Sequence, residues 1–298
     1  MPVPGPCERT IMEPLNAFDP DGVGVDNGAY FGMPFDPSAA ELVLVSVPWD
    51  VTVSYGAGTA YGPDAIIEAS TQLDFHEPLA PGAWRRGIAT ADIDYTLQET
   101  SQRLRADAAK VIRHLEGGGT VDDDYVMRKI RRVNEGCAAM NDAVGAQVGR
   151  WLDAGKIVGL VGGDHSTPYG LIRALGERHE AFGVLHIDAH RDLREAYEGF
   201  LFSHASIMFN VLRDVPQVRK LVQVAVRDFS EREAALADAS ERVESFADLD
   251  LAAAEFRGET WDAQCRRIVE TLPEEVYVSF DIDGLGFEYC PRTGTPVC

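Results

Sequence analysis

Three side chains that can bind a metal ion follow one another at alternate positions past the middle of the chain. They are Asp188, His190 and Asp192, and they come directly after the apolar run 183–187. Alternate side chains of an extended segment point to the same side, so these three can converge on one point. Two carboxylates and an imidazole are costly to bury unpaired, and a divalent cation would remove that cost. Taken alone, the cluster is equally compatible with a solvated strand end that precedes a helix.

Two further apolar runs end in residues of the same kind. The run 156–162 is followed by His165, and the run 276–283 carries Asp281 and Asp283 at its end. Short continuous apolar runs are typical of parallel strands buried on both faces, and ligands bind at the carboxyl ends of such strands. We therefore predict one metal site whose ligands are His165, Asp188, His190, Asp192, Asp281 and Asp283.

Segments with strand and helix patterns alternate along the chain. Strands are predicted over 41–47, 88–94, 156–162, 181–187, 221–226 and 276–283. Helices are predicted over 64–70, 96–115, 122–132, 134–154, 166–178, 203–212, 233–250 and 259–272. The connections are too long for hairpins, which favours a three-layer α/β/α fold with a mainly parallel sheet. We expect an irregular N-terminal arm over residues 1–40 and a single domain over 41–298.

The composition is that of an acidic globular protein. The chain has 298 residues, of which 45% are hydrophobic and 25% charged, and its formal net charge is −21. This charge argues against nucleic acid or an anionic membrane as a partner and favours small cations. Five scattered cysteines form no metal or disulfide pattern, and neither a signal peptide nor a membrane-spanning run is visible. We expect a cytoplasmic protein.

The ligand types indicate which metal the site would take. Six ligands without a thiolate are too many for one tetrahedral zinc, whereas oxygen-rich ligation with some imidazole suits Mn²⁺, with Ni²⁺, Co²⁺ or Fe²⁺ as substitutes. Carboxylates can bridge, so we expect two ions about 3.5 Å apart. Such a pair lowers the pKa of bound water from about 16 towards about 7, which predicts hydrolysis without a serine or cysteine nucleophile.

Three segments resemble, in order and spacing, the signatures of the ureohydrolases. They are Gly162-Gly-Asp-His-Ser166, Asp188-Ala-His-Arg-Asp192 and Ser279-Phe-Asp-Ile-Asp283, with Thr293-Gly-Thr-Pro296 behind the last. This family contains arginase, agmatinase, formimidoylglutamase and guanidine-type hydrolases. The resemblance implies an arginase-like fold, two Mn²⁺ per subunit, a small cationic guanidino substrate that is cleaved to urea and an amine, and a homotrimer or homohexamer.

The resemblance also implies how the ligands are shared. One Mn²⁺ would be held by His165, Asp188, Asp192 and Asp281. The other would be held by Asp188, His190, Asp281 and Asp283, so that Asp188 and Asp281 bridge the two ions.

Two residues are expected to move protons. His204 stands where the family has a histidine that carries a proton to the leaving amine, and Asp283 would accept a proton during attack. By contrast, His186 precedes Asp188 by two residues, and we expect it to support the site or to lie in the core.

The substrate is less well defined. An agmatinase-type substrate is favoured, but a formimidoylglutamase-type or guanidine-type hydrolase stays open, because Arg191 and Arg194 could meet a substrate carboxylate or form surface ion pairs. Segment 193–203 is expected to line the pocket mouth.

The C-terminal end departs from the family pattern. The chain ends at Cys298, whereas ureohydrolases typically continue through a further helix and strand. We therefore expect a fold that lacks the usual C-terminal strand and helix, with an unpaired sheet edge and exposed apolar surface. A weakly active, metal-binding homologue is the remaining alternative.

Overall fold

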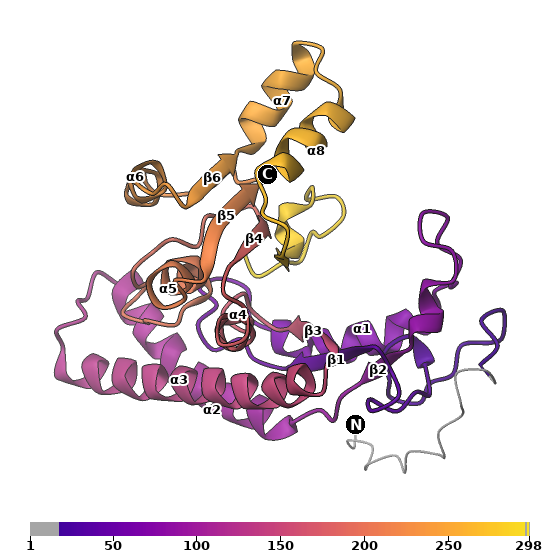
Figure 1. Ribbon diagram of the computed structural model, residues 1–298. Coiled ribbons are helices and arrows are strands. Elements are labelled where there is room, and N and C mark those ends of the chain that lie inside the picture. The colour runs from indigo at the N-terminus through magenta and orange to yellow at the C-terminus, as the bar shows by residue number, and fades with distance from the viewer. Residues whose placement is uncertain (1–17, 296, 298) are drawn as a thin grey trace.

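Two parallel sheets form the centre of the computed structural model, in which residues 18–295 and 297 are described (Figure 1). The first sheet has the order β2-β1-β3, with β1 at Leu42–Val47, β2 at Ile88–Thr90 and β3 at Ile157–Gly162. The second has the order β6-β5-β4-β7, with β4 at Phe182–Ile187, β5 at Val218–Val224, β6 at Val243–Phe246 and β7 at Val276–Phe280. All pairings between these strands are parallel, which confirms the predicted fold class.

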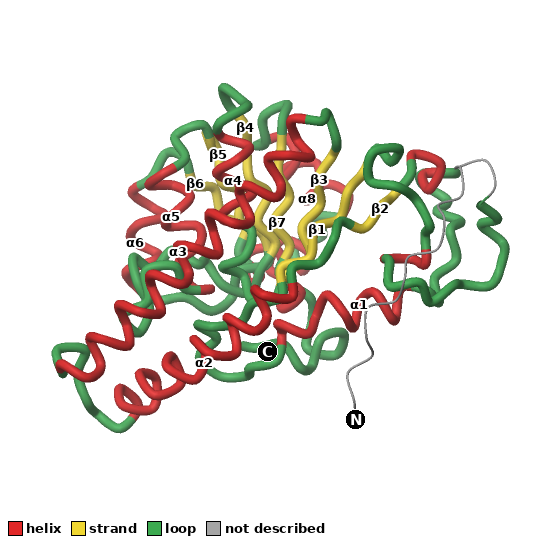
Figure 2. The backbone as a smooth tube through the Cα atoms, turned by 90° about the horizontal axis from the view of Figure 1, so that it is seen from below, coloured by secondary structure: helices red, strands yellow, loops and turns green. Residues whose placement is uncertain are grey.

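Helices cover the sheets on both sides (Figure 2). They are α1 Gly62–Ser70, α2 Tyr95–Glu116, α3 Asp124–Asp153, α4 Tyr169–Gly176, α5 Ile207–Asp214, α6 Glu231–Ala239, α7 Asp248–Phe256 and α8 Trp261–Glu270. The layers are therefore helix, sheet and helix, as predicted. Within the described part of the chain, no helix is long and apolar enough to cross a membrane.

The strand β5 shows why its sequence is apolar without alternation. Leu221 is buried in a cluster with Ile207 of α5, whereas the next residue, Val222, is buried in a different cluster with Leu251 of α7 and Ile268 of α8. Successive side chains of a strand point to opposite faces. Because helices cover both faces, the successive residues Leu221 and Val222 both meet apolar neighbours.

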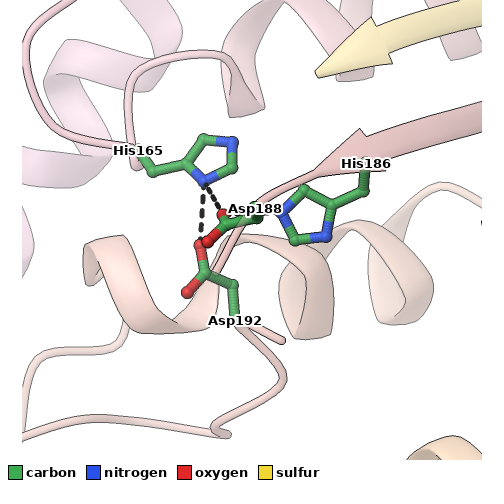
Figure 3. A group of neighbouring side chains, drawn as sticks. All are labelled: His165, His186, Asp188 and Asp192. Carbon is green, nitrogen blue, oxygen red and sulfur yellow. Dashed lines mark hydrogen bonds and ion pairs between the residues drawn. The ribbon is translucent and has the colours of Figure 1, made fainter. Parts of the chain in front are cut away.

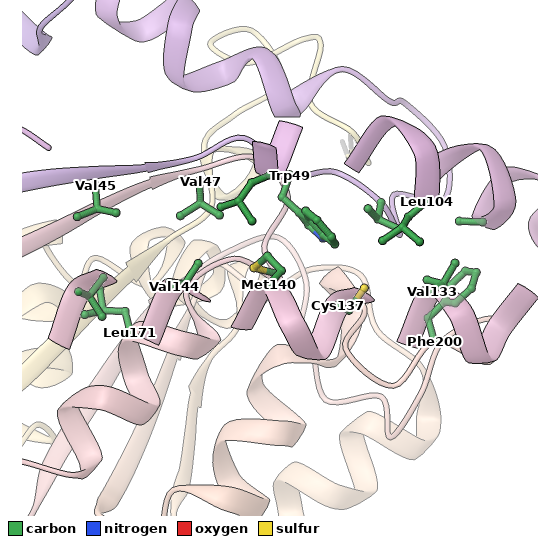
Figure 4. Packing of buried hydrophobic residues seen from close by; sticks show 14 of the residues in the cluster. Val45, Val47, Trp49, Leu104, Val133, Cys137, Met140, Val144, Leu171 and Phe200 are labelled. Atoms are coloured by element: carbon green, nitrogen blue, oxygen red, sulfur yellow. The ribbon is translucent and has the colours of Figure 1, made fainter. Parts of the chain in front are cut away.

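A further cluster packs β1 and the loop after it against the long helices (Figure 4). Helix α3 contributes fully buried side chains at intervals of three or four residues, the spacing of one helical face, at Val133, Cys137, Met140, Val144 and Val148. They pack with Val47 and Trp49, whose exposed fractions are both 0%. This packing fixes the segment that leads from β1 towards the predicted site.

Two helix predictions are wrong. Segment 233–250 contains the strand β6 between α6 and α7, because Val243 pairs with Leu221 of β5, and this tertiary pairing overrides a weak local helix pattern. The two helices predicted over 122–132 and 134–154 form one continuous helix, α3. Its start is acidic as predicted, and Asp123 caps it by accepting hydrogen bonds from the backbone N–H groups of Tyr125 and Val126.

Strands β3 and β7 lie at the edges of their sheets. Among the described residues, each pairs with a strand on one side only. Apolar side chains are exposed at the start of β3, where Ile157 is 51% exposed, and along β7, where Val278 is 54% and Phe280 48% exposed. An unpaired edge with exposed apolar surface was expected from the sequence, and the structure shows two such edges.

The described part of the N-terminal arm, residues 18–40, is irregular apart from a short 3₁₀ turn at Tyr30–Gly32. Met33, Phe35 and Ala40 pack with Ala89 of β2. The Tyr30 hydroxyl lies 2.7 Å from the Ser46 hydroxyl of β1. These contacts cover one end of the first sheet. Residues 1–17 of the predicted arm lie outside the described residues.

Candidate metal centre

The six predicted ligands come from the loops that follow β3, β4 and β7. Parallel strands deliver their carboxyl ends to the same side of the fold, so these loops can meet. One cavity is lined by all of the predicted ligands and by His204, the ligands being His165, Asp188, His190, Asp192, Asp281 and Asp283. The structure therefore brings together every residue that the sequence assigned to the site.

The first group of ligands surrounds one imidazole nitrogen (Figure 3). Nδ1 of His165 lies 2.8 Å from Oδ2 of Asp188, 3.0 Å from Oδ2 of Asp192 and 3.4 Å from Oδ2 of Asp281. Carboxylates from two further loops thus converge on a histidine that follows β3.

A second group surrounds His190. Its Nδ1 lies 3.2 Å from Oδ2 of Asp283 and 3.4 Å from Oδ1 of Asp188. Asp188 is therefore common to both groups, and it contributes a different oxygen to each. The atoms of Asp188, His190 and Asp283 that could hold a metal lie within 4.8 Å of one another.

Two buried polar atoms at the site lack a hydrogen-bond partner, and they indicate whether a cation would fit there. Although the contacts are short, Nδ1 of His165 and Oδ2 of Asp192 are buried and receive no well-directed hydrogen bond from the described residues. An unpaired buried polar atom costs about 1–3 kcal/mol, which a bound cation would offset. Four carboxylates and two imidazoles form a donor set that suits Mn²⁺. The residues therefore fit divalent metal ions.

The acids and imidazoles of the cluster shift one another's pKa. Burial opposes the charge of His190, but its contacts with Asp188 and Asp283 outweigh burial and raise the pKa of His190 to about 11. Burial and the nearby Asp188 raise the pKa of Asp192 to about 8 and that of Asp281 to about 7. The protein alone therefore retains protons at this site near pH 7, and a cation would displace them.

Asp192 has a strained backbone. Its φ is 53°, in the left-handed region that residues other than glycine seldom adopt. Its carbonyl oxygen accepts hydrogen bonds from the backbone N–H groups of Met208 and Phe209, each at 3.1 Å, in the first turn of α5. These tertiary contacts stabilise the left-handed backbone of Asp192, which turns the chain directly after the last of the three candidate ligands that follow β4.

His204 lies beside the ligands and belongs to neither group within the described structure. It starts the 3₁₀ turn that leads into α5, and its backbone N–H donates to Oγ1 of Thr52 at 3.1 Å. Burial, reinforced by the nearby His190, lowers the pKa of His204 to about 4. The imidazole is therefore neutral near pH 7 and can take up a proton from a reacting group.

Sequence reasoning missed Arg227, which ties the last ligand loop to β5. Its Nη2 donates to the carbonyl oxygens of Asp283 at 2.6 Å and Leu285 at 3.0 Å, and its Nη1 donates to that of Ala225 at 3.2 Å. The available signal was a basic residue directly after the apolar run of β5. Its partners Asp283 and Leu285 lie 56 and 58 residues further along the chain, so spacing alone could not reveal the role.

A larger cavity of about 470 Å³ opens beside the ligands. Arg194 and Tyr197 line it, as the prediction for segment 193–203 required, together with Asp228, Phe229 and Glu233. Arg194 is paired, because its Nε lies 3.5 Å from Oε2 of Glu233. Arg194 is therefore not a free cation that could attract a substrate carboxylate.

Arg191, the other candidate for a substrate carboxylate, is buried. Its Nη1 donates to Oε1 of Gln223 at 3.1 Å and to Oγ of Ser245 at 2.7 Å. Its guanidinium also lies over the ring of Phe229, 4.2 Å from the centroid. The side chain is therefore part of the framework behind the ligands.

Comparison with known proteins gives a consistent result. The model of the arginase family matches residues 40–298. An N(1)-aminopropylagmatine ureohydrolase of Thermus thermophilus is 29% identical over 263 residues, which cover 87% of this chain and 72% of the relative. An agmatinase of Proteus mirabilis is 29% identical over 272 residues, which cover 90% of this chain and 74% of the relative.

Solved structures show the same fold. A proclavaminate amidino hydrolase from Streptomyces clavuligerus superposes with a TM-score of 0.67 at 19% identity, covering 93% of this chain and 80% of that one. The agmatine ureohydrolase of Thermoplasma volcanium gives a TM-score of 0.63 at 22% identity, covering 88% of this chain and 74% of that one.

Proposed function

This chain is a ureohydrolase of the arginase family, and on that premise we propose that it is a dinuclear manganese amidinohydrolase of the agmatinase type. It would hydrolyse the guanidino group of a small cationic substrate and release urea and an amine. The observation that carries the proposal is the placement of Asp188, whose two oxygens belong to two different ligand groups. That is the arrangement a carboxylate needs to bridge two ions.

The proposed ligand sets combine the two groups with the family resemblance, which adds Asp281 to the second group as well as the first. One ion would be held by His165, Asp188, Asp192 and Asp281, and the other by Asp188, His190, Asp281 and Asp283. Bound Mn²⁺ would supply the Lewis acidity that makes water a nucleophile near neutral pH.

The protein's own groups would then handle the protons. Asp283 is fixed by a hydrogen bond from the Ala189 backbone N–H to Oδ1 at 3.1 Å, and its Oδ2 faces the site, where it would accept a proton as water adds to the guanidinium carbon. His204 would take up a proton and deliver it to the amine nitrogen as the carbon–nitrogen bond breaks. Its low pKa keeps the imidazole neutral in the resting protein and makes the protonated ring a strong acid, which favours delivery of the proton to the amine nitrogen.

The wider cavity favours a substrate with a cationic tail. Asp228 lines it with a side chain that is 66% exposed, and Phe229 and Tyr197 add aromatic surface. The exposed carboxylate attracts an ammonium group through its charge. Guanidinium groups already lie over the two rings, that of Arg191 over Phe229 at 4.2 Å and that of Arg194 over Tyr197 at 4.8 Å, so the support for a cationic tail comes from the charge of Asp228. The names of the relatives, agmatinase and N(1)-aminopropylagmatine ureohydrolase, refer to guanidines with such tails. Because Arg194 is paired with Glu233, a formimidoylglutamase-type substrate with carboxylates has less support.

Two further properties belong to the proposal. We expect a cytoplasmic homotrimer or homohexamer, on the basis of the family. The size of the assembly can be measured by light scattering during size-exclusion chromatography.

The test of the proposal is metal analysis combined with a substrate panel. The purified chain, reconstituted with Mn²⁺, is assayed for urea release from agmatine, N(1)-aminopropylagmatine, arginine and 4-guanidinobutyrate, and for formamide release from formimidoylglutamate. The proposal requires bound Mn²⁺ and a higher kcat/KM for the two substrates with cationic tails. Bound metal without urea release from any guanidine would contradict the proposal. Turnover of formimidoylglutamate alone would contradict it too and would show a formimidoylglutamase-type activity instead.

A further inference from the structure

A second buried imidazole contacts the ligand that both groups share. His186 lies on β4, two residues before Asp188 (Figure 3), and it is fully buried, with an exposed fraction of 0%. Its Nε2 lies 2.8 Å from Oδ2 of Asp188. It could therefore be a metal ligand itself, or it could hold Asp188 in place. The hydrogen bonds of its other nitrogen distinguish the two roles.

The partner of that other nitrogen is Gln223 on β5, the residue directly opposite His186 in the parallel register. Nε2 of Gln223 lies 3.1 Å from Nδ1 of His186 and 2.8 Å from the carbonyl oxygen of Arg191. Oε1 of Gln223 accepts from Nη1 of Arg191 at 3.1 Å. A guanidinium can only donate and a carbonyl oxygen can only accept, so the orientation of the Gln223 amide is fixed by chemistry.

This orientation determines where the proton of His186 sits. The second N–H of the Gln223 amide faces Nδ1 of His186, so Nδ1 must accept a hydrogen bond. The proton of the neutral ring is then on Nε2, from which it is donated to Oδ2 of Asp188. A nitrogen that carries a proton has no lone pair for a metal ion.

We propose that His186 is a positioning residue: through an Nε2–H tautomer set by Gln223 and Arg191, it holds Asp188 in the orientation that lets this carboxylate bridge two metal ions. This deepens the proposed function and rests on it. Arg191 is itself anchored to Ser245 of β6 at 2.7 Å. The network therefore runs from β6, which lies at the other edge of the second sheet from β7, to the shared ligand.

The hydrogen bonds of Asp188 explain how such positioning would work. Oδ1 accepts from the backbone N–H of His190 at 2.6 Å, and Oδ2 accepts from His186 at 2.8 Å. A carboxylate oxygen has two lone pairs, so each oxygen keeps one for a metal ion once His165, whose Nδ1 also lies 2.8 Å from Oδ2, gives up its proton and binds the ion itself. With one donor on each oxygen, the carboxylate cannot rotate without losing a buried hydrogen bond.

The tautomer is tested by NMR of the full chain with ¹⁵N-labelled histidine, before and after Zn²⁺ is added as a diamagnetic probe. The expected spectrum has a protonated Nε2 and an unprotonated Nδ1 for His186, and the Nε2 proton persists when Zn²⁺ binds. A proton on Nδ1, or loss of the Nε2 proton on binding, would overturn the inference, and the second result would make His186 a ligand.

The positioning role is tested by the Kd for Mn²⁺ of three variants. His186→Phe keeps the ring volume but removes the donor, and we expect a Kd about 10–100-fold higher, the usual effect of removing a partner of a metal ligand. His186→Gln restores a donor, because its Nε2 is as many bonds from the backbone as the imidazole Nε2, and it should recover most of the affinity. The control His179→Phe alters an imidazole paired with Glu275 far from the site, and should bind Mn²⁺ as the parent does.

Three results would overturn the inference. His186→Phe could bind Mn²⁺ as tightly as the parent, or a folded His186→Gln could bind as weakly as His186→Phe. Should His186→Phe fail to fold, Gln223→Leu takes its place, because it frees the tautomer of a retained His186, and parent-like binding by that variant would also overturn the inference. Absence of Mn²⁺ binding by the parent chain would instead contradict the proposed function, which keeps the two failures distinct.

Discussion

His165 and Asp188 meet across the boundary between the two hydrogen-bonded sheets, with Nδ1 of the histidine 2.8 Å from Oδ2 of the aspartate. His165 follows β3, the edge strand of one sheet, and Asp188 follows β4, an inner strand of the other. A hydrogen bond between His165 Nε2 and the Ser279 hydroxyl of β7, at 2.8 Å, adds a second link. The candidate metal centre thus joins two parts of the fold.

Mn²⁺ should therefore stabilise the whole chain. At a concentration of 100 times Kd, one site adds about 2.7 kcal/mol to the free energy of unfolding, and thermal unfolding should show a higher Tm. Asp188→Asn should abolish the rise, since it removes the shared ligand. Asp142→Asn changes an exposed acid paired with Arg173 and should keep it. An unchanged Tm for the parent with saturating Mn²⁺ would contradict this expectation.

Mn²⁺ affinity should increase with pH. The pKa of His190 is raised to about 11, and that of His165 is raised well above its usual range because contacts with Asp188 and Asp192 outweigh burial. Both imidazoles carry protons near neutral pH, and a cation must displace them. Titration calorimetry between pH 6 and pH 8 should give a falling Kd. In buffers of different ionisation enthalpy it should show proton release. A Kd independent of pH would rule out this coupling.

Replacing His204 should separate catalysis from metal binding. His204→Asn removes the proposed proton carrier, and loss of a general acid–base group lowers kcat by about 10²–10⁴-fold. Because His204 lies in neither ligand group, the Mn²⁺ content measured by atomic absorption should equal that of the parent. A kcat of the His204→Asn variant within twofold of the parent value would show that His204 does not transfer a proton in the reaction.

The charge of Asp228 should matter for substrates with a cationic tail. Asp228→Asn removes a carboxylate at the cavity, and we expect KM for agmatine to rise by roughly tenfold, equivalent to about 1.4 kcal/mol. Butylguanidine, which lacks the ammonium group, is the matched control and should keep its KM. Equal changes for both compounds would show that Asp228 does not recognise the tail.

The clustering of the candidate ligands could be predicted from the sequence because each follows an apolar run that forms a parallel strand. Alternation then placed Asp188, His190 and Asp192 together, and topology placed His165, Asp281 and Asp283 beside them. Local pattern sufficed to place each residue at the end of a strand, and the parallel topology brings those strand ends together.

Other features depend on contacts between distant segments and were not predictable. The strand β6 exists because it pairs with β5, and its four residues lie within a segment of helical appearance. The separation of the strands into two sheets and the carbonyl contacts of Arg227 also join residues far apart in sequence. The supporting role inferred for His186 needed the hydrogen bonds of Gln223, a residue with no distinguishing pattern.

The central claim is that Asp188 bridges two metal ions, and electron paramagnetic resonance of the Mn²⁺-loaded chain tests it most directly. Titration of the parent should end at two Mn²⁺ per chain, with the spectrum of an exchange-coupled pair, because a shared carboxylate would hold the ions close together, at about 3.5 Å. Asp188→Asn should lose that coupling. One Mn²⁺ per chain, or two ions with uncoupled spectra, would contradict the proposal.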